Sequence, residues 1–287
     1  MNYYYLIAGL PEIEIEDNKL TFSVAGFKKE VRPLLSSIDA RLFDLFFMKF
    51  DNHNLLRYLR DKETKFDERG NITKEEMEEC FLLMSEEYEP KNKYFRLYFK
   101  AFVLEYQETQ QVATDAAKWE NRLTELYYQR AMNCGNKFIA DWFEFNLNLN
   151  NILAAYTGRK HKLNIEVIGN NEVAESIKTS NQRDFGLTAN FENFDIFQRL
   201  ADESDLFERE KKIDLLKWQW LDEQTFFSYF SIEQVFAYLV KLEIIERWLT
   251  LDPIEGEKLF RNLIDSLKDS VVNSPESINL QMNELNK

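Results

Sequence analysis

The sequence has few residues that interrupt regular secondary structure. Only 8 of its 287 residues are glycine and only 5 are proline, whereas glycine alone makes up roughly 7% of an average protein. Doubly wound α/β enzymes need glycines for tight turns and phosphate-binding loops, so this class is disfavoured. Long stretches without glycine or proline, together with helical spacing of apolar residues, predict an all-α protein.

Residues that commonly carry catalysis or bind metals are also scarce. The chain has two histidines, His53 and His161, and two isolated cysteines, Cys80 and Cys134. Histidine pairs of the HExxH type, paired cysteines, the nucleophile elbow GxSxG and the phosphate loops GxxxxGK[ST] and GxGxxG are all missing. We therefore expect no catalytic residue, cofactor or metal, and we expect both thiols to be buried in a reducing compartment.

Two features could nevertheless hold a metal. His53 lies beside Asp51 in "DNHNLLRY", but a surface or capping role needs fewer assumptions because further ligands are absent. Four carboxylates crowd "KEEMEEC", and at the start of a helix they favour the helix dipole; they are Glu75, Glu76, Glu78 and Glu79. His161 is expected to be a solvated loop residue.

Long apolar runs and a positive charge balance are missing too. No stretch reaches the ~18 apolar residues of a membrane span, and the N-terminus lacks the basic region of a signal peptide. The net charge of −14 repels nucleic acids and anionic lipids. We expect a cytoplasmic protein with no nucleic-acid partner, held at a membrane only through other proteins.

The apolar residues that are present have helical spacing after the first ~25 positions. Residues 3–7 and 20–24 are aromatic and β-branched, which predicts short strands or extended arms. Ser36 with Asp39 can cap a helix with an apolar stripe of Ile38, Leu42, Leu45 and Phe46. Asp51 is a candidate N-cap of the next helical segment, and Thr73 with Glu76 forms a capping box.

Residues 92–132 contain no glycine or proline, which predicts one long helix or two in near-continuity, ended by the residues 133–135. The next helix has its apolar face at Trp142, Phe145, Leu149, Ile152, Leu153 and Tyr156, and we expect Gly158 to close it. It also contains four asparagines, although asparagine is a poor helix former: Asn146, Asn148, Asn150 and Asn151. They could recognise a ligand or make local hydrogen bonds; the local use is favoured because buried amides are usually satisfied nearby.

The second half of the sequence predicts a boundary between lobes and further helices. Residues 159–190 are polar and form the expected boundary between lobes. Ser231 is a candidate N-cap for a helix with a stripe of Ile232, Val235, Leu239, Leu242, Ile245 and Leu249. Asp252 and Pro253 begin a last predicted helix, with a stripe of Phe260, Leu263, Ile264, Leu267 and Val271. Residues 1–272 are thus predicted to form one all-helical unit, followed by a polar tail at 273–287.

Aromatic residues are abundant, with 24 Phe, 13 Tyr and 5 Trp. The densest run is "DLLKWQWLDEQTFFSYF". It could form a cofactor box, but helix packing combined with a partner surface explains it better, since Trp and Tyr are favoured in both. The candidate anchors for a partner are Trp218, Trp220, Tyr229 and Phe230.

Several short stretches of the sequence resemble known protein families. "EQVFAYLVKLEIIERW" resembles the closing segment of the funnel-shaped central-stalk protein of V-type and archaeal-type rotary ATPases, which carries the letter C, or d in eukaryotes; the matching residues are Glu233, Ala237, Tyr238, Leu239, Lys241 and Glu243. "FDNHNLLRYLRDK" is similar to the family's first-lobe element at 54–57. Asn148, Ile152 and Leu153 are similar to its internal repeat, although Ala154 stands near the expected arginine. "YYYLIAGLPEI" resembles a bacterial family whose members accompany V-type ATPase subunits.

The resemblance implies a multi-lobed, funnel-like helical bundle of three similar lobes. Such a protein sits on the membrane rotor ring, receives the foot of the central shaft and transmits torque without an active site. It adds Tyr238, Lys241 and Glu243 to the expected partner contacts. The chain is shorter than is usual for that family, so a helix pair could be missing. Two alternatives remain open: a helical adaptor for an unrelated partner, and an enzyme with an unfamiliar helical active site.

Overall fold

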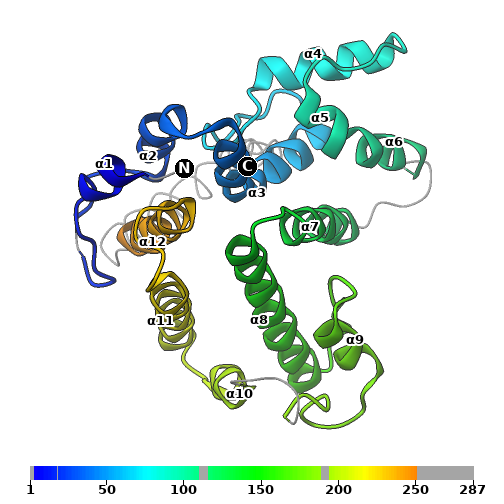
Figure 1. Cartoon of the computed structure of the whole chain (residues 1–287). Helices are drawn as coiled ribbons and strands as arrows, with labels where there is room; N and C mark the ends of the chain where they lie inside the picture. The colour runs from blue at the N-terminus through cyan, green and yellow to red at the C-terminus, as the bar shows by residue number, and fades with distance from the viewer. Residues whose placement is uncertain (1–2, 18, 110–115, 189–193, 251–287) are drawn as a thin grey trace, which may run out of the picture.

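The computed structural model describes residues 3–17, 19–109, 116–188 and 194–250. Within these residues the chain has twelve α-helices, one 3₁₀ helix and no strand (Figure 1). The all-α class predicted from the sequence is confirmed. The elements are α1 (Tyr4–Ala8), α2 (Val24–Val31), η1 (Arg32–Leu34), α3 (Ser37–Arg60), α4 (Lys74–Ser85), α5 (Lys93–Tyr98), α6 (Lys100–Thr109), α7 (Ala116–Met132), α8 (Lys137–His161), α9 (Glu172–Thr179), α10 (Phe194–Asp202), α11 (Leu206–Thr225) and α12 (Ile232–Thr250). No helix among the described residues is both long enough and apolar enough to span a membrane.

Six helices pack against one another in a closed circuit. Helix α3 contacts α7, α7 contacts α8, α8 contacts α10, α10 contacts α11, α11 contacts α12, and α12 returns to α3. Figure 1 shows α11 and α12 facing α7 and α8 across the middle of this circuit. The centre of the molecule is therefore enclosed by helix faces that come from widely separated parts of the sequence.

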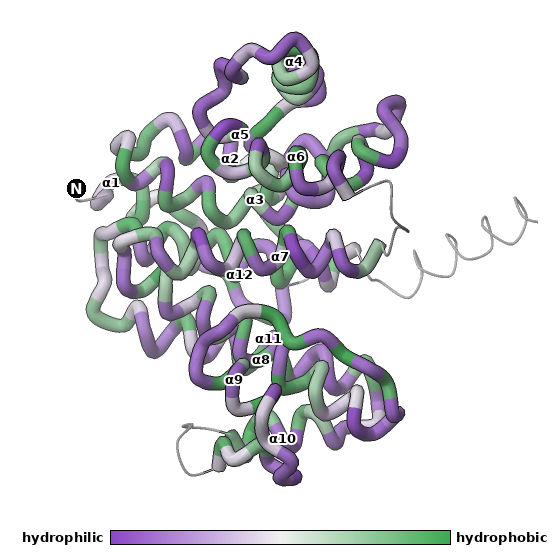
Figure 2. The backbone as a smooth tube through the Cα atoms, turned by 90° about the vertical axis from the view of Figure 1, so that its right-hand side faces the viewer, coloured by the Kyte–Doolittle hydropathy of each residue, from purple (hydrophilic) through white to green (hydrophobic). Residues whose placement is uncertain are grey.

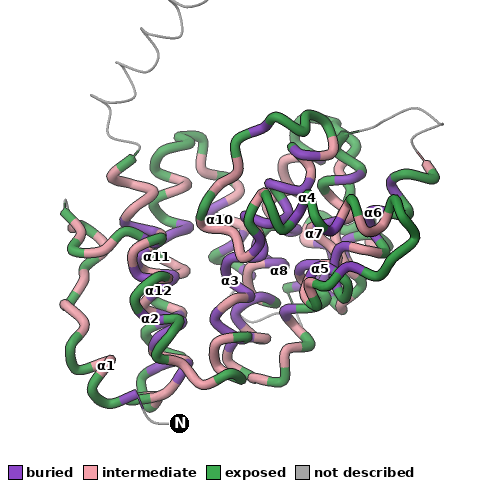
Figure 3. The backbone as a smooth tube through the Cα atoms, turned by 90° about the horizontal axis from the view of Figure 1, so that it is seen from above, coloured by how far each residue is buried: buried purple, intermediate pink, exposed green. Residues whose placement is uncertain are grey.

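Two apolar clusters stabilise the circuit. The larger one joins α2–α8, α11 and α12, and it is rich in phenylalanine, including the fully buried Phe43, Phe47 and Phe236. The smaller one joins the second half of α8 to α9, α10 and α11. Apolar and polar positions are interspersed along the helices (Figure 2). Helices α3, α8 and α12 contain the most buried positions (Figure 3). The predicted boundary region 159–190 contains α9, which packs on α8.

For residues 3–7 and 20–24 the sequence predicts short strands or extended arms, and the strands are wrong. Residues 4–8 form helix α1, and residues 20–23 are an irregular segment that leads into α2. A strand needs a neighbouring strand for its hydrogen bonds, and the described part of the chain contains none. The segment instead makes isolated contacts: the Tyr3 N–H donates to the Phe230 carbonyl at 2.7 Å, and the Ser23 side chain accepts from the Gly26 N–H as the N-cap of α2.

Helix α3 confirms one predicted cap and corrects another. The Ser36 hydroxyl accepts the Asp39 N–H at 3.2 Å, as expected for an N-cap. Asp51, in contrast, starts no helix: α3 is continuous through it, and its side chain is buried. The run of apolar residues on both sides of Asp51 keeps the helix in the core. Ile38, predicted in the apolar stripe, is 63% exposed.

The next boundaries are partly as predicted. The Thr73–Glu76 capping box at the start of α4 is confirmed, and α7 ends at Met132 just before residues 133–135. The prediction of one long helix, or of two in near-continuity, over 92–132 is wrong, because the described residues of this stretch divide into three helices, α5, α6 and α7. The break between α5 and α6 falls at Phe99, where neither glycine nor proline marks it.

Helix α12 starts after Ser231, but the Ser231 hydroxyl has no hydrogen-bond partner among the described residues. The last predicted helix, from Asp252, and the predicted tail at 273–287 lie outside the described residues.

Gly158 does not close helix α8 as predicted. The helix continues to His161 and ends at Lys162, whose φ of 55° is left-handed. Gly158 is buried, and a Cβ atom there would lie 2.6 Å from Ile165 Cγ1 and 3.2 Å from the Leu163 carbonyl oxygen. The glycine is therefore required by the close return of the chain after the helix.

We expect the substitution Gly158→Ala to destabilise the protein by about 1–3 kcal/mol, because the added methyl group overpacks the contact with residues 163–165. This cost opposes the gain of up to about 1 kcal/mol that alanine normally brings to a helix. Urea unfolding measures the difference. Lys160→Ala, an exposed change in the same helix, is the control and should leave stability nearly unchanged. Greater stability of Gly158→Ala would show that the chain after α8 is not held against this residue.

Candidate interaction surface

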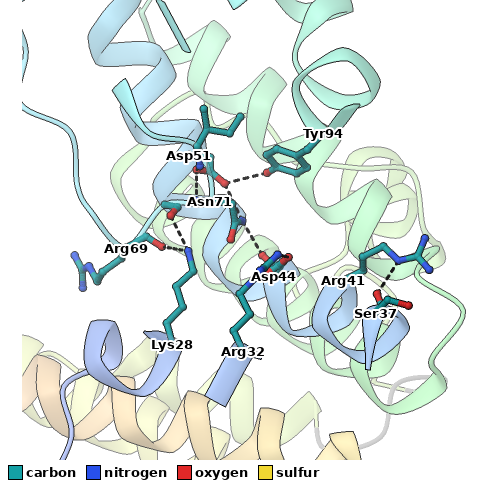
Figure 4. A network of polar contacts seen from close by, with 11 residues as sticks. Lys28, Arg32, Ser37, Arg41, Asp44, Asp51, Arg69, Asn71 and Tyr94 are labelled. Carbon is teal, nitrogen blue, oxygen red and sulfur yellow. Dashed lines mark hydrogen bonds and ion pairs between the residues drawn. The ribbon is translucent and has the colours of Figure 1, made fainter. Parts of the chain in front are cut away.

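The buried carboxylate of Asp51 is the first group to consider as a chemical site. Its Oδ1 accepts the backbone N–H groups of Asn71 at 2.6 Å and Ile72 at 3.0 Å. Its Oδ2 accepts the Asn71 side-chain amide at 2.9 Å and the Tyr94 hydroxyl at 3.0 Å (Figure 4). Burial raises the pKa of Asp51 to about 6, and the donors together with the nearby Lys28 oppose that rise. Both oxygens are occupied, so the group ties a loop to α3 and leaves no face for a ligand.

Lys28 reaches the same loop from α2. Its ammonium donates to the backbone carbonyls of Arg69 at 2.8 Å and Gly70 at 2.6 Å (Figure 4). Burial lowers the pKa of Lys28 to about 8, while the attraction of Asp51 and Asp44 works in the other direction. The lysine thus caps loop carbonyls, a structural use that explains its burial.

Helices α3 and α8 each hold a following loop through the side chain of an asparagine. The Asn54 side chain exchanges two hydrogen bonds with the backbone of Asp67, at 3.0 and 2.8 Å. The Asn151 side chain does the same with the backbone of Ile168, at 2.8 and 3.0 Å. Each asparagine stands before two aliphatic residues on a long helix and holds the loop that follows the helix.

The residue three positions before each of these asparagines completes the repeat. Asp51 accepts a hydrogen bond from the Asn71 amide, and Asn148 accepts one from the Asn171 amide at 2.7 Å. Asn171 is also the N-cap of α9. The pairs α3–α4 and α8–α9 are therefore two copies of one motif. The sequence pattern of this motif is a polar residue, two intervening positions, an asparagine and two aliphatic residues.

The asparagine-rich stretch of α8 therefore serves local structure. Asn148 and Asn151 are buried and hold the following loop. The Asn146 amide donates to the carbonyl of Trp142 at 2.8 Å, and the Asn150 amide donates to the Tyr128 hydroxyl at 3.1 Å. The local hydrogen bonds favoured from the sequence are present.

The other candidate metal ligands are on the surface. His53 is exposed on α3 and His161 is exposed at the end of α8. The four glutamates at the start of α4 are exposed and have ordinary partners or solvent: Glu76 accepts the Thr73 N–H at 3.0 Å, Glu79 pairs with Lys91 at 3.1 Å, Glu78 pairs with Lys74 at 3.8 Å, and Glu75 lies in the first turn. Within the described ranges, no group of three or more histidine, cysteine or acidic side chains could hold a metal ion.

Both cysteines are free thiols. Cys80 is buried and Cys134 is half-buried. Burial raises the pKa of both thiols, which keeps them protonated and poorly nucleophilic at neutral pH.

The two tryptophans predicted as partner anchors pack inside the molecule. Trp218 is 9% exposed and lies under the Lys241 ammonium, 4.7 Å from its ring centroid. Trp220 is half-buried, with its ring 5.4 Å from those of Trp142 and Phe145. The structure thus uses both rings between α11 and the neighbouring helices.

The polar residues of the predicted motif also make internal contacts. The Tyr238 hydroxyl donates to the Pro11 carbonyl at 3.1 Å. Lys241 forms an ion pair with Asp222. Glu243 forms an ion pair with Lys49 and lines a cavity at the centre of the molecule. These side chains connect α12 to its neighbours.

Tyr229 and Phe230, the remaining predicted anchors, belong to an exposed cluster that we call the aromatic surface. It lies on α1 and on the loop between α11 and α12. Its members and exposed fractions are Tyr4 at 53%, Tyr5 at 91%, Phe226 at 64%, Phe227 at 83%, Tyr229 at 62% and Phe230 at 37%. The Tyr4 ring lies 4.7 Å from that of Phe230 and 5.6 Å from that of Tyr5, so α1 and the loop form one patch.

An apolar groove of about 500 Å³ adjoins the aromatic surface. Tyr4 and Tyr5 belong to both, which makes groove and surface continuous. The groove is lined by Tyr3, Tyr4, Tyr5, Leu6, Gly9, Leu10, Phe22, Phe27, Glu30, Val31 and Leu34. Sequence reasoning missed the role of Tyr4 and Tyr5 because it assigned them to a strand, although three successive tyrosines at 3–5 are an unusual signal.

The position of the groove is held by polar contacts beneath it. The Tyr3 hydroxyl donates to the Asp39 carboxylate and accepts the Ser36 N–H at 3.1 Å. Tyr3 thereby attaches α1 to the start of α3, and its backbone attaches α1 to the loop at Phe230. The exposed rings are thus carried by a fixed support, which suits a docking face.

Comparison with known proteins identifies one family. The family model described as "Protein of unknown function (DUF2764)" matches residues 1–271. No curated protein and no solved structure matches the chain.

Proposed function

From the premise that the chain belongs to the family described as "Protein of unknown function (DUF2764)", we propose that it is a non-catalytic component of a V-type rotary ATPase. In this proposal its aromatic surface docks onto the foot of the central shaft, and the protein joins that shaft to the membrane rotor ring. It would lie at the cytoplasmic face of the cell membrane through the complex alone.

The observation that carries the proposal is the aromatic surface continuous with an apolar groove. Six large aromatic residues are exposed on α1 and the α11–α12 loop, and ring contacts join Tyr4, Tyr5, Tyr229 and Phe230. Each such side chain contributes about 1.5–3 kcal/mol when it is fully removed from water, and exposed apolar patches of this kind mark interaction sites. Tyrosine and tryptophan are enriched among the residues that dominate binding energy, and other aromatic residues are enriched at interfaces.

The charges around the patch define the partner further. Glu30 lines the groove, and Glu223 is exposed three residues before Phe226. The whole chain carries a net charge of −14. A complementary partner would present apolar side chains surrounded by a basic rim, because opposite charges at the rim accelerate association and set orientation.

The assignment to a rotary ATPase is supported by the sequence resemblance and by the duplicated motif. The resemblance implies a protein of similar helical lobes, and α3–α4 and α8–α9 repeat one pattern of hydrogen bonds. An adaptor for an unrelated helical partner would use the same aromatic surface. The identity of the protein bound there distinguishes the two.

The test is recovery of the endogenous protein from membranes washed with chelator and low salt. Wild type should be released with ATPase subunits, including the shaft. The double variant Tyr5→Ser with Phe227→Ser should lose at least about 30-fold of its affinity for the shaft, since a single hot-spot residue contributes about 2 kcal/mol or more. Leu82→Ser is the matched control, because Leu82 is 58% exposed on the distant helix α4.

Both variants should keep the unfolding midpoint of the wild type, because all three side chains are exposed. Recovery of the wild-type protein alone, from cells that contain an intact V-type ATPase, would contradict the proposal. Recovery with another protein whose binding depends on Tyr5 and Phe227 would establish the adaptor function instead.

A further inference from the structure

A cavity lined by both polar and apolar side chains lies between helices of the circuit. Its volume is about 320 Å³, within the size range of sites for small molecules. Side chains from five helices line it: α3, α7, α8, α11 and α12. None of the residues that line it belongs to the aromatic surface on α1 and the α11–α12 loop.

Two ion pairs form part of the cavity wall. Lys49 pairs with Glu243, and Arg247 pairs with Asp214. The Asp214 side chain is only 3% exposed, and it also accepts the Trp248 indole N–H at 2.7 Å. Both carboxylates of the wall are therefore paired with cations, and Arg247 also pairs at 3.1 Å with Glu210, which is outside the cavity lining.

Lys217 adds a third cation to this wall. No described residue accepts a hydrogen bond from its ammonium or forms an ion pair with it, although it is partly buried on α11. Burial lowers its pKa; Asp214 and Glu243 act to raise the pKa, and Arg247 and Lys49 act to lower it. The cavity thus contains three cations and two carboxylates, in a chain whose net charge is −14.

Neutral groups beside Lys217 can complete a binding site. Asn146 and Asn150 line the cavity from α8, and each amide has a second N–H beyond the one used in its hydrogen bond within the protein. Trp142 and Phe143 supply aromatic surface on the same side. A site with one cation that is not in an ion pair, amide donors and aromatic walls suits a small molecule that has an anionic end and an apolar body.

We propose that this cavity binds a small organic oxyanion, a carboxylate or a phosphate monoester, with Lys217 as its principal counter-ion. The Lys217 ammonium lines the cavity without an ion-pair partner among the described residues, and an oxyanion would supply charge-assisted hydrogen bonds to it. Lys49 and Arg247 are paired with the two carboxylates of the wall. This site is independent of the docking function of the aromatic surface.

Calorimetric titration of the full chain with benzoate, phenyl phosphate and inorganic phosphate, at constant ionic strength, tests the proposal. Wild type should bind at least one of these probes saturably, and Lys217→Met should bind it at least about 10-fold more weakly, equivalent to about 1.4 kcal/mol. Lys217→Arg keeps the charge and should retain most of the affinity. Lys211→Met is the control, because Lys211 is exposed on the same helix.

The three probes separate the two ligand classes: preference for benzoate indicates a carboxylate, and preference for either phosphate probe indicates a phosphate. Circular dichroism checks folding, and Lys217→Gln replaces Lys217→Met if that variant does not fold. Absence of saturable binding of all three probes at millimolar concentration would overturn the proposal. Equal affinity of wild type and Lys217→Met would overturn it as well.

Discussion

Replacing Asp51 by alanine should lower the free energy of unfolding by about 3–5 kcal/mol, the range for removing one partner of a buried charged network. The carboxylate is fully buried and accepts four hydrogen bonds, two from backbone N–H groups and two from the side chains of Asn71 and Tyr94. Its removal leaves these donors without an acceptor in the core, where each unsatisfied group costs about 1–3 kcal/mol.

Removal of the Asp51 carboxylate should also release the loop between α3 and α4. Gly70 lies so close that a Cβ there would be 2.6 Å from Asp51 Oδ1, which shows how tightly the loop is drawn to the carboxylate. Urea unfolding measures the change in stability, and hydrogen exchange at Asn71 and Ile72 measures the release of the loop. Glu63→Ala, an exposed change in the same loop, should alter stability by less than about 0.5 kcal/mol. Equal stability of Asp51→Ala and Glu63→Ala would show that the network contributes nothing.

Replacing Trp218 by alanine should cost about 3–5 kcal/mol of stability, as expected for truncating a large core aromatic residue. Trp218 is 9% exposed, packs in the larger apolar cluster and is covered by the Lys241 ammonium. The position is a candidate partner anchor on sequence grounds, so the measurement separates packing from docking. A residue used only at an interface would leave the isolated protein as stable as the wild type.

Tyr229→Ala is the matched control, since Tyr229 comes from the same aromatic run and is 62% exposed. Its stability should stay close to that of the wild type. In urea unfolding we expect wild type and Tyr229→Ala to have similar stability, and we expect Trp218→Ala to be less stable than both. If Trp218→Ala unfolds at the wild-type midpoint, the ring is not part of the packing that joins α11 to α12.

Several features of this protein follow from its sequence alone. The shortage of glycine and proline and the period of its apolar residues determine the all-α class. Ser36, the Thr73–Glu76 box and residues 133–135 mark helix ends that the structure contains. These features depend on residues within about four positions of each other, because capping bonds and helix periodicity act over that distance. A sequence window contains all the partners involved.

The tertiary structure alone decides which side chains are buried, exposed or brought together. Asp51 has the sequence context of a helix start, but the loop 67–72 folds back and supplies its partners. Tyr4 and Tyr5 become part of a surface because the α11–α12 loop lies beside them. Lys49 and Glu243 meet across 194 positions of the chain. Such pairings depend on how whole helices pack. Local periodicity and capping do not reveal them, because both are the same whether or not the distant partner is present.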